Sequence, residues 1–524
     1  MNWAKRETIE RLFEEACRMG VVDSHTHIQD DLTDFDAEAA STNLAGTQAS
    51  VNAFPDNVVQ AGLAQRRLVR RTMTDATHGC LYSWFAEVAE GRRGHLDAAL
   101  KAVGGNSEQE RRRAGALLVE EFHDSRYSEY AEWLRFMFRL YGESDEADPL
   151  DPGHFDHVYD AVKRHRNDPA FAEKILQQNK IRCYVTSIEN RDKIPADPKH
   201  ARVGQVDLSH ATHPEAYNMF DAHYLIWPEG ATDFGLFAGG HKYEAEKYLL
   251  NLEQMLGCTI QNVRDLKAGI KEFLLQILYS PTHNPKSRVR YTNLFHPMDY
   301  RFGRPYDSAA VNTTIRYRKD CVHGDDLRQL TAVATEAMLE ALDEIGLDLK
   351  RSGEAYGSCL QSAIGVTYFM DTAREIQSFP MYAAGLPQDE YAVWSNYPNI
   401  HFEYIVAHEQ LYSDLANAAK QVGNVSVGPW WHFFRKHKIA AMMSDQLSMG
   451  PISAIAGGFT DARFVEMLAA KYRSVRWAVA AALAQSVDDP AASMTHEAAI
   501  GVMREILLEN PAKVHHLPLE AAGR

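Results

Sequence analysis

Short β-rich segments alternate with amphipathic helices over much of this 524-residue chain, and this alternation limits the folds open to it. The β-rich runs are residues 181–187, 223–227, 288–295 and 400–407. Apolar residues at helical spacing lie between them, at roughly 242–256, 262–279 and 326–344. Such alternation is typical of a parallel α/β architecture. We therefore predict an α/β fold, a (β/α)8 TIM-type barrel.

The chain is much longer than the roughly 250 residues of a minimal barrel, which leaves room for a large insertion. Residues 28–179 have a mostly polar, helical pattern, and long insertions in barrels lie in loops. We predict an N-terminal helix and first barrel strand in 1–27, and a large helical insertion after that strand in 28–179. The remainder of the barrel is expected in 180–524.

The first predicted strand carries a pair of histidines at its end. Residues 7–19 show helical spacing, Gly20 is suited to end that helix, and a short apolar run then leads into Asp23-Ser-His25-Thr-His27. Residues two apart in a strand share a face, so both imidazoles can point to one spot. Barrel active sites collect at the carboxyl ends of strands. The pair therefore predicts one divalent metal ion; zinc is favoured, and manganese or another first-row metal stays open.

A carboxylate from a late strand is expected to complete this site. The apolar run 454–459 leads into Thr460-Asp461-Ala-Arg463, and barrel closure brings the first and last strands together. Asp461 could be a metal ligand or a general base, and Arg463 could hold an anionic substrate. His296, which ends the 288–295 run, is another candidate substrate contact. The plainer alternative is a helix N-cap at Asp461 with a surface arginine.

These motifs resemble those of the uronate isomerase family, within the amidohydrolase superfamily. The family's Asp-x-His-x-His matches residues 23–27. Its Gly-Ser-Gly-Trp-Trp-Phe motif resembles Val427-Gly-Pro-Trp-Trp-His-Phe433, and its Thr-Asp-Ser-Arg segment resembles residues 460–463. The resemblance is patchy over nearly the whole chain and most specific from 425 to 470. It indicates a divergent member of the family.

The resemblance implies a role for each matching residue. His25, His27 and Asp461 would hold one divalent ion, and Arg463 would contact the substrate. His78 would reach in from the inserted domain as a catalytic group.

Tryptophans are implied as walls of the substrate pocket, at Trp430, Trp431 and Trp227. The last of these marks a departure from the family. Its Trp-Arg-Pro-Asp segment reads Trp227-Pro-Glu-Gly230 here, so the arginine suited to the sugar acid is missing. A buried arginine–carboxylate contact is strong and specific, so its loss predicts a changed substrate preference.

The predicted function is aldose–ketose isomerisation of a uronate or related sugar acid, by proton transfer through an enediol(ate) intermediate. The alternative is a metal-dependent hydrolase of a lactone, ester or amide in the same superfamily. No convincing lysine ends a predicted strand, which disfavours the hydrolase. A barrel used only for binding or assembly is a third hypothesis, and the retained histidine and Thr-Asp-x-Arg motifs argue against it.

Composition restricts the partners. Asp and Glu outnumber Lys and Arg by 71 to 55, and the net charge of −16 argues against nucleic acid. No stretch approaches 18 uncharged apolar residues, so no membrane partner is expected. Six scattered cysteines without CxxC spacing and the lack of a signal-peptide core at the N-terminus make the cytoplasm the expected location. We expect a small sugar-acid substrate, and a homo-oligomer stays open.

Overall fold

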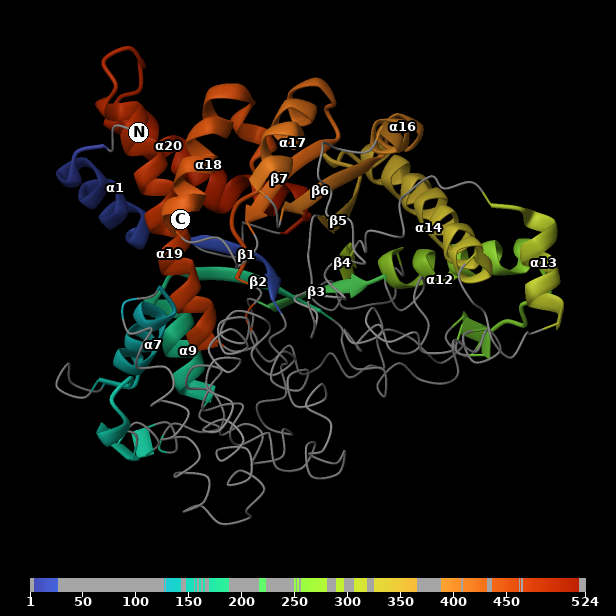
Figure 1. Ribbon diagram of the computed structural model, residues 1–524, viewed down its shortest axis with the longest axis horizontal. Coiled ribbons are helices and arrows are strands. Elements are labelled where there is room, and N and C mark those ends of the chain that lie inside the picture. Colours follow the sequence, from blue (N-terminus) through green and yellow to red (C-terminus); the bar gives the residue numbers. More distant parts are fainter. Residues whose placement is uncertain are drawn as a thin grey trace.

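The central element is a sheet of seven parallel strands in the order of the chain (Figure 1). The computed structural model describes residues 4–26, 129–142, 148–154, 169–187, 216–222, 256–279, 289–295, 306–317, 325–364, 388–406, 409–430, 436–460, 462 and 465–517, with a few residues between these ranges. The strands are β1 (Val21–Thr26), β2 (Ile181–Ser187), β3 (Ala216–Asp221), β4 (Val289–Phe295), β5 (Ser358–Ile364), β6 (Ile400–Val406) and β7 (Val425–Trp430). Parallel neighbours that follow each other in the chain require crossover connections, which is why long segments separate them.

Helices cover one side of this sheet (Figure 1). The longer ones are α1 (Arg6–Arg18), α7 (Glu129–Leu140), α9 (Pro169–Gln178), α12 (Val263–Tyr279), α13 (Ser308–Tyr317), α14 (Asp325–Arg351), α16 (Gln388–Asn396), α17 (Glu409–Gln421), α18 (Lys436–Met449) and α19 (Val465–Asp488). α14 packs on β5 and β6, α17 packs on β6 and β7, and α1 packs on α19. Short turns η3 (Pro152–His154) and η7 (Ile452–Ala454) complete this part.

Alternation along the strands divides the core into two parts. Val21 and Phe220 belong to the large cluster shared with the helices. Their neighbours Val22 and Met219 belong to a second cluster, together with Tyr291 of β4. Successive strand residues point to opposite faces, so the second cluster marks the other side of the sheet, here called the inner face. Inner-face residues of β1 to β5 contact one another, which requires the sheet to curve.

The segment after η7 lies beside β7, on the side opposite to β6. A parallel bridge joins Val427 to Ile455. Gly428 permits this approach, because a Cβ there would lie 3.0 Å from the backbone nitrogen of Ala456. Among the described residues, the strand predicted at 454–459 therefore consists of the end of a 3-10 turn and one β-bridge, and Gly457 has a positive φ of 90°.

The last described segment closes the inner face at the amino ends of the strands. It runs through α20 (His496–Arg504), the π-helical turn η8 (Glu505–Glu509) and α21 (Asn510–Val514). Val514 and Leu517 join the inner cluster. His516 Nε2 lies 2.9 Å from the Gly357 carbonyl oxygen before β5, and Arg290 Nη1 donates to the His516 carbonyl at 3.0 Å. The chain thus plugs the end of the sheet opposite to the end of β1 that carries the histidines.

The structure confirms most of the predicted elements. The β-rich runs at 181–187, 288–295 and 400–407 are β2, β4 and β6, and the helices predicted at 262–279 and 326–344 lie within one residue of α12 and inside α14. β3 lies at 216–221, before the run predicted at 223–227, which is outside the described residues. In the predicted insertion 28–179, α7 and α9 are helical; most of its other residues lie outside the described part, and the insertion stays a prediction.

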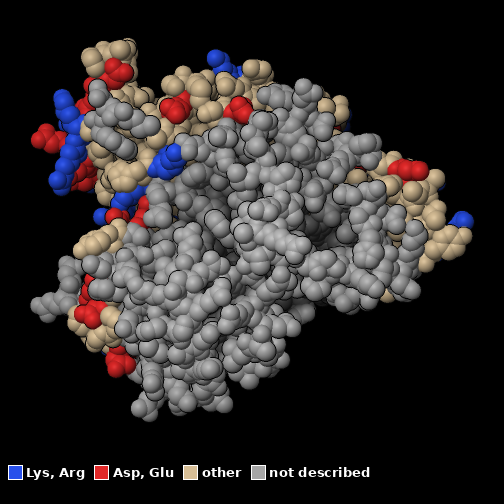
Figure 2. Space-filling view, in the orientation of Figure 1, with Lys and Arg blue, Asp and Glu red and all other residues tan. Residues whose placement is uncertain are grey.

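The described surface carries charges of both signs side by side. Figure 2 shows acidic and basic side chains together over α1, where Arg6 pairs with Glu10 at 2.6 Å and Arg18 pairs with Glu15 at 2.8 Å. These are exposed pairs, worth little stability each. Among the described helices, none is both long and apolar enough to cross a membrane.

Candidate functional site

The carboxyl end of β1 is buried and held by the segment that precedes Asp461. Asp23 Oδ1 accepts a hydrogen bond from the Thr460 backbone nitrogen at 3.1 Å, and Asp23 Oδ2 accepts one from the Thr460 hydroxyl. Asp23 Oδ1 also accepts from the His25 backbone nitrogen at 3.2 Å. One carboxylate therefore fixes both the strand that carries the histidines and the residue bonded to Asp461.

Two residues of α19 bond to the same two segments, the end of β1 and the residues up to Thr460. Lys471, which is 3% exposed, donates from Nζ to the Thr460 carbonyl at 2.5 Å. The Tyr472 hydroxyl lies 2.5 Å from the Val22 carbonyl and 3.0 Å from the Gly458 carbonyl. The segment before position 461 is thus joined to β1 through the side chains of Asp23 and Tyr472, and Lys471 ties it to α19. The end of β1 and the residues just before position 461 therefore lie together, as the sequence predicted.

Burial also changes the ionisation of Asp23. Loss of water raises the pKa of this carboxyl to about 7, while the hydrogen bonds from Thr460 and His25 and the charge of Lys471 act in the opposite direction. The donors on both oxygens favour the charged form. Asp23 is therefore a buried carboxylate whose donors all come from the protein around it.

The His25 ring is oriented by a buried glutamine of β5. His25 Nδ1 lies 2.7 Å from Gln361 Oε1, and Gln361 Nε2 donates to Glu403 Oε2 at 2.7 Å. A carboxylate only accepts, which assigns the amide nitrogen to the Glu403 side and the amide oxygen to the His25 side. A neutral His25 then carries its proton on Nδ1 and its lone pair on Nε2. Coordination through Nε2 requires this tautomer, so His25 fits a metal ion here.

The polar contacts continue along the inner face to the C-terminal segment. Glu403 Oε2 lies 3.1 Å from His515 Nε2, and both side chains are fully buried. The Tyr291 hydroxyl donates to the Ser24 carbonyl. Gln361, Glu403 and His515 were not found from the sequence, because isolated polar residues in otherwise apolar runs carry no motif. Only Thr460 lay within a motif already noted.

Several predicted site residues lie outside the described part of the chain. These are His27, His78, Trp227, His296, Trp431, Asp461 and Arg463. Trp430 ends β7, and its side chain is not described. His25 is 5% exposed, and its ring packs edge-to-face on Phe459 with centroids 5.4 Å apart. The metal site of His25, His27 and Asp461 therefore stays a prediction, as do the substrate contacts.

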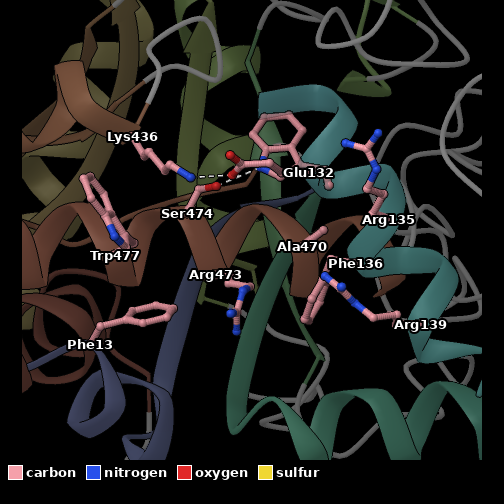
Figure 3. A pocket seen from close by; sticks show the side chains of 11 residues that line it. Phe13, Glu132, Arg135, Phe136, Arg139, Lys436, Ala470, Arg473, Ser474 and Trp477 are labelled. Carbon is pink, nitrogen blue, oxygen red and sulfur yellow. Dashed lines mark hydrogen bonds and ion pairs between the residues drawn. The ribbon is translucent and has the colours of Figure 1, made fainter. Parts of the chain in front are cut away.

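A hollow of about 260 Å³ lies elsewhere, between α1, α7, α18 and α19 on the helix side of the sheet (Figure 3). Lys436 Nζ is paired with Glu132 there, and Trp133 Nε1 donates to Ser474 Oγ at 2.8 Å. None of the predicted catalytic or metal-binding residues lines it. The hollow is a separate feature on the outside of the helix layer.

Solved structures of three isomerases align with nearly the whole of this chain. Glucuronate isomerase from Caulobacter crescentus aligns with a TM-score of 0.66 at 13% identity, over 99% of this chain and 95% of that one. Uronate isomerase from Thermotoga maritima aligns at 0.62 and 12%, over 98% of both chains. Uronate isomerase from Bacillus halodurans C-125 aligns at 0.55 and 15%, over 98% of this chain and 97% of that one.

The match lies in the structure and not in the sequence. No model of a known protein family matches this chain, and no curated protein matches it by sequence. At 12–15% identity the structural similarity establishes the fold, which is the TIM-barrel-like α/β fold of the uronate isomerases. The predicted fold class is confirmed at that level, and the family resemblance seen in the sequence is found again in the structure.

Proposed function

We propose that this chain, which has the fold of the uronate isomerases, is a metal-dependent aldose–ketose isomerase acting on a uronate or a related sugar acid. One observation carries the proposal: Asp23 of β1 binds Thr460, the residue that precedes Asp461 in the chain. In this fold, ligands gather at the carboxyl ends of the strands.

The metal ion would be held by His25, His27 and Asp461, with zinc the favoured element. When bound, it would polarise the hydroxyl and carbonyl oxygens of the sugar and so acidify the hydrogen on carbon. The chain's part is to orient the ligands. Gln361 orients the His25 ring. Asp23 and Lys471 hold the backbone of Thr460, the residue before Asp461.

Isomerisation moves one proton between two adjacent carbons and redistributes one between two oxygens. Asp461 would act as the base that carries the proton between the carbons. Arg463 would bind the carboxylate of the sugar acid with its planar guanidinium. The missing family arginine beside Trp227 makes Arg463 more important here, and it predicts a substrate other than the usual uronate.

Deuterium exchange tests the reaction directly. The zinc- or manganese-loaded protein is incubated in deuterated water with glucuronate, galacturonate, their keto forms and other sugar acids, and NMR follows interconversion and exchange at carbon. We expect one aldose–ketose pair to interconvert with deuterium uptake. Asp461→Asn should abolish it, and Asp445→Asn, an exposed change on α18, should not.

The outcome against the proposal is equally clear. A metal-loaded protein that neither interconverts nor exchanges any member of the panel is not a sugar-acid isomerase. Hydrolysis of lactones or esters by the same preparation would then favour the hydrolase alternative.

A further inference from the structure

Three side chains of metal-binding type meet on the inner face, away from the predicted metal site. Cys359 is on β5, Glu403 is on β6, and His515 follows α21. One donor atom of each lies within 4.8 Å of the other two. Their side chains are essentially inaccessible, with exposed fractions of 1% for Cys359 and 0% for Glu403 and His515. Three segments far apart in the chain thus bring a thiol, a carboxyl and an imidazole to one buried point.

The hydrogen bonding of this cluster is incomplete. Both ring nitrogens of His515 and Glu403 Oε1 are buried, and none of them has a hydrogen-bond partner among the described residues. His515 Nε2 is 3.1 Å from Glu403 Oε2, yet the two groups are not aligned as a hydrogen bond. Buried polar atoms nearly always have partners, and an exception calls for a missing water or ion. An imidazole and a carboxylate that are close but not directed at each other are arranged like two ligands of one cation.

We propose that Cys359, Glu403 and His515 form a second metal site, for zinc or a chemically similar divalent ion. Thiolate, carboxylate and imidazole are the three ligand types that zinc takes in proteins. In a tetrahedral site with bonds of about 2.0–2.3 Å, ligand atoms lie roughly 3–4 Å apart, so small movements of the present atoms would suffice. The sulfur ligand disfavours magnesium and calcium.

Metal binding requires the thiolate form of Cys359. On binding, the thiol proton leaves to solvent and the sulfur becomes the ligand. Gln361, which donates to Glu403 Oε2 at 2.7 Å, holds the carboxylate ligand from behind.

A cation here would tie the end of the described chain to the sheet. His515 comes from the segment that plugs the amino ends of the strands, whereas Cys359 and Glu403 belong to the sheet itself. All three ligands are buried, so the cation would connect these segments inside the protein. The proposal does not depend on the isomerase function, because none of its ligands belongs to the predicted His25, His27 and Asp461 site.

Cobalt(II) binding provides the test, because a sulfur ligand gives cobalt a near-ultraviolet charge-transfer band. The full chain, stripped of metal with a chelator, is titrated with cobalt(II). We expect a saturable band that zinc removes by competition. It should be lost in Cys359→Ser and kept in His27→Ala. It should also be kept in Cys183→Ser, the matched change at another buried cysteine of the inner cluster.

If the wild-type protein binds cobalt(II) without the sulfur charge-transfer band, the proposal is wrong. A band that survives Cys359→Ser would also overturn it. Should Cys359→Ser fail to fold, His515→Gln decides the assignment. This variant should weaken the cobalt affinity read from the band at least tenfold, and an unchanged affinity contradicts the role of His515.

Discussion

Two buried carboxylates, Asp23 on β1 and Glu403 on β6, are both fully inaccessible but differ in their partners. Asp23 accepts on both oxygens, from Thr460 and from the His25 backbone. Glu403 accepts from Gln361 on one oxygen, and its other oxygen has no hydrogen-bond partner in the part of the chain that the structure describes. A carboxylate whose donors all come from the protein fixes the chain around it. A carboxylate that lacks such donors, like Glu403, marks a place where a ligand from outside the chain can complete the hydrogen bonding or coordination.

The largest effect is expected from Asp23→Ala, which leaves the Thr460 nitrogen and hydroxyl buried without an acceptor. The free energy of unfolding should fall by about 3–5 kcal/mol, because the variant breaks several hydrogen bonds to a buried charge. Urea denaturation measures this. Glu14→Ala removes an exposed carboxylate of α1 and should change the value by less than about 0.5 kcal/mol. Equal stabilities of the two variants would contradict the role given to Asp23.

Glu466 of α19 provides an intermediate case, since its Oε1 accepts one hydrogen bond, from the Tyr141 hydroxyl at 2.8 Å. Burial raises the pKa of Glu466 to about 7, from an ordinary value of 4.5. Between these two values the folded protein holds a proton that the unfolded chain has released. Its contribution to stability is therefore present below pH 4.5 and is lost as the pH rises to 7, by up to about 3 kcal/mol.

Unfolding free energies at pH 5 and pH 7.5 measure this loss. Glu466→Gln should remove the share of Glu466 from the difference between the two pH values and leave that of Asp23, whose pKa burial also raises to about 7, whereas the exposed change Glu14→Gln should leave the whole difference as in the wild type. A pH dependence that is the same in Glu466→Gln and wild type would show that Glu466 is ionised in the folded protein throughout.

Gln361 links the two regions compared above, because its side chain contacts both His25 and Glu403. Gln361→Leu should lower the affinity for zinc at the predicted His25 site by 10- to 100-fold, the usual effect of removing a residue that orients a ligand. Equilibrium dialysis of the Cys359→Ser background reports that site alone. Gln446→Leu, at a buried glutamine bonded to Tyr412, is the matched control and should bind zinc as before. Equal affinities in the two variants would separate Gln361 from the metal site.

The smallest effect belongs to an ordinary buried hydrogen bond outside the strands. Trp133→Phe keeps an aromatic ring at the hollow of Figure 3 but removes the donor to Ser474. We expect a loss of about 1 kcal/mol in unfolding free energy and no change in metal affinity. A change in metal affinity of this variant would show that the hollow is coupled to the site.

The strands that the sequence missed share a physical reason. β3 reads Ala-Tyr-Asn-Met-Phe-Asp and β5 reads Ser-Cys-Leu-Gln-Ser-Ala-Ile, with few β-branched residues and with polar groups that serve the inner face. β7 contains Gly428-Pro429, a pair that signals a turn. Propensity identifies strands rich in β-branched and aromatic residues, such as β2 and β6. Strands that lack such residues are determined by tertiary contacts.

The candidate site divides in the same way. The motif at 23–27 and the segment at 460–463 were visible because their residues are adjacent in the chain. The supporting groups Gln361, Lys471 and His515 come from separate elements, and only folding brings them together. Local spacing can therefore indicate ligands, but it cannot indicate the residues that hold them.

The bond between Asp23 and Thr460 spans 437 residues of chain. β1 is made early in synthesis, yet the acceptor groups at its end have no partner until nearly the whole polypeptide has left the ribosome. Contacts of such sequence separation slow folding and prolong the exposure of unpaired strand edges. Newly made chains of this protein should therefore depend on chaperones more than proteins with locally completed sheets, and truncation before residue 460 should yield aggregates and not a smaller folded unit.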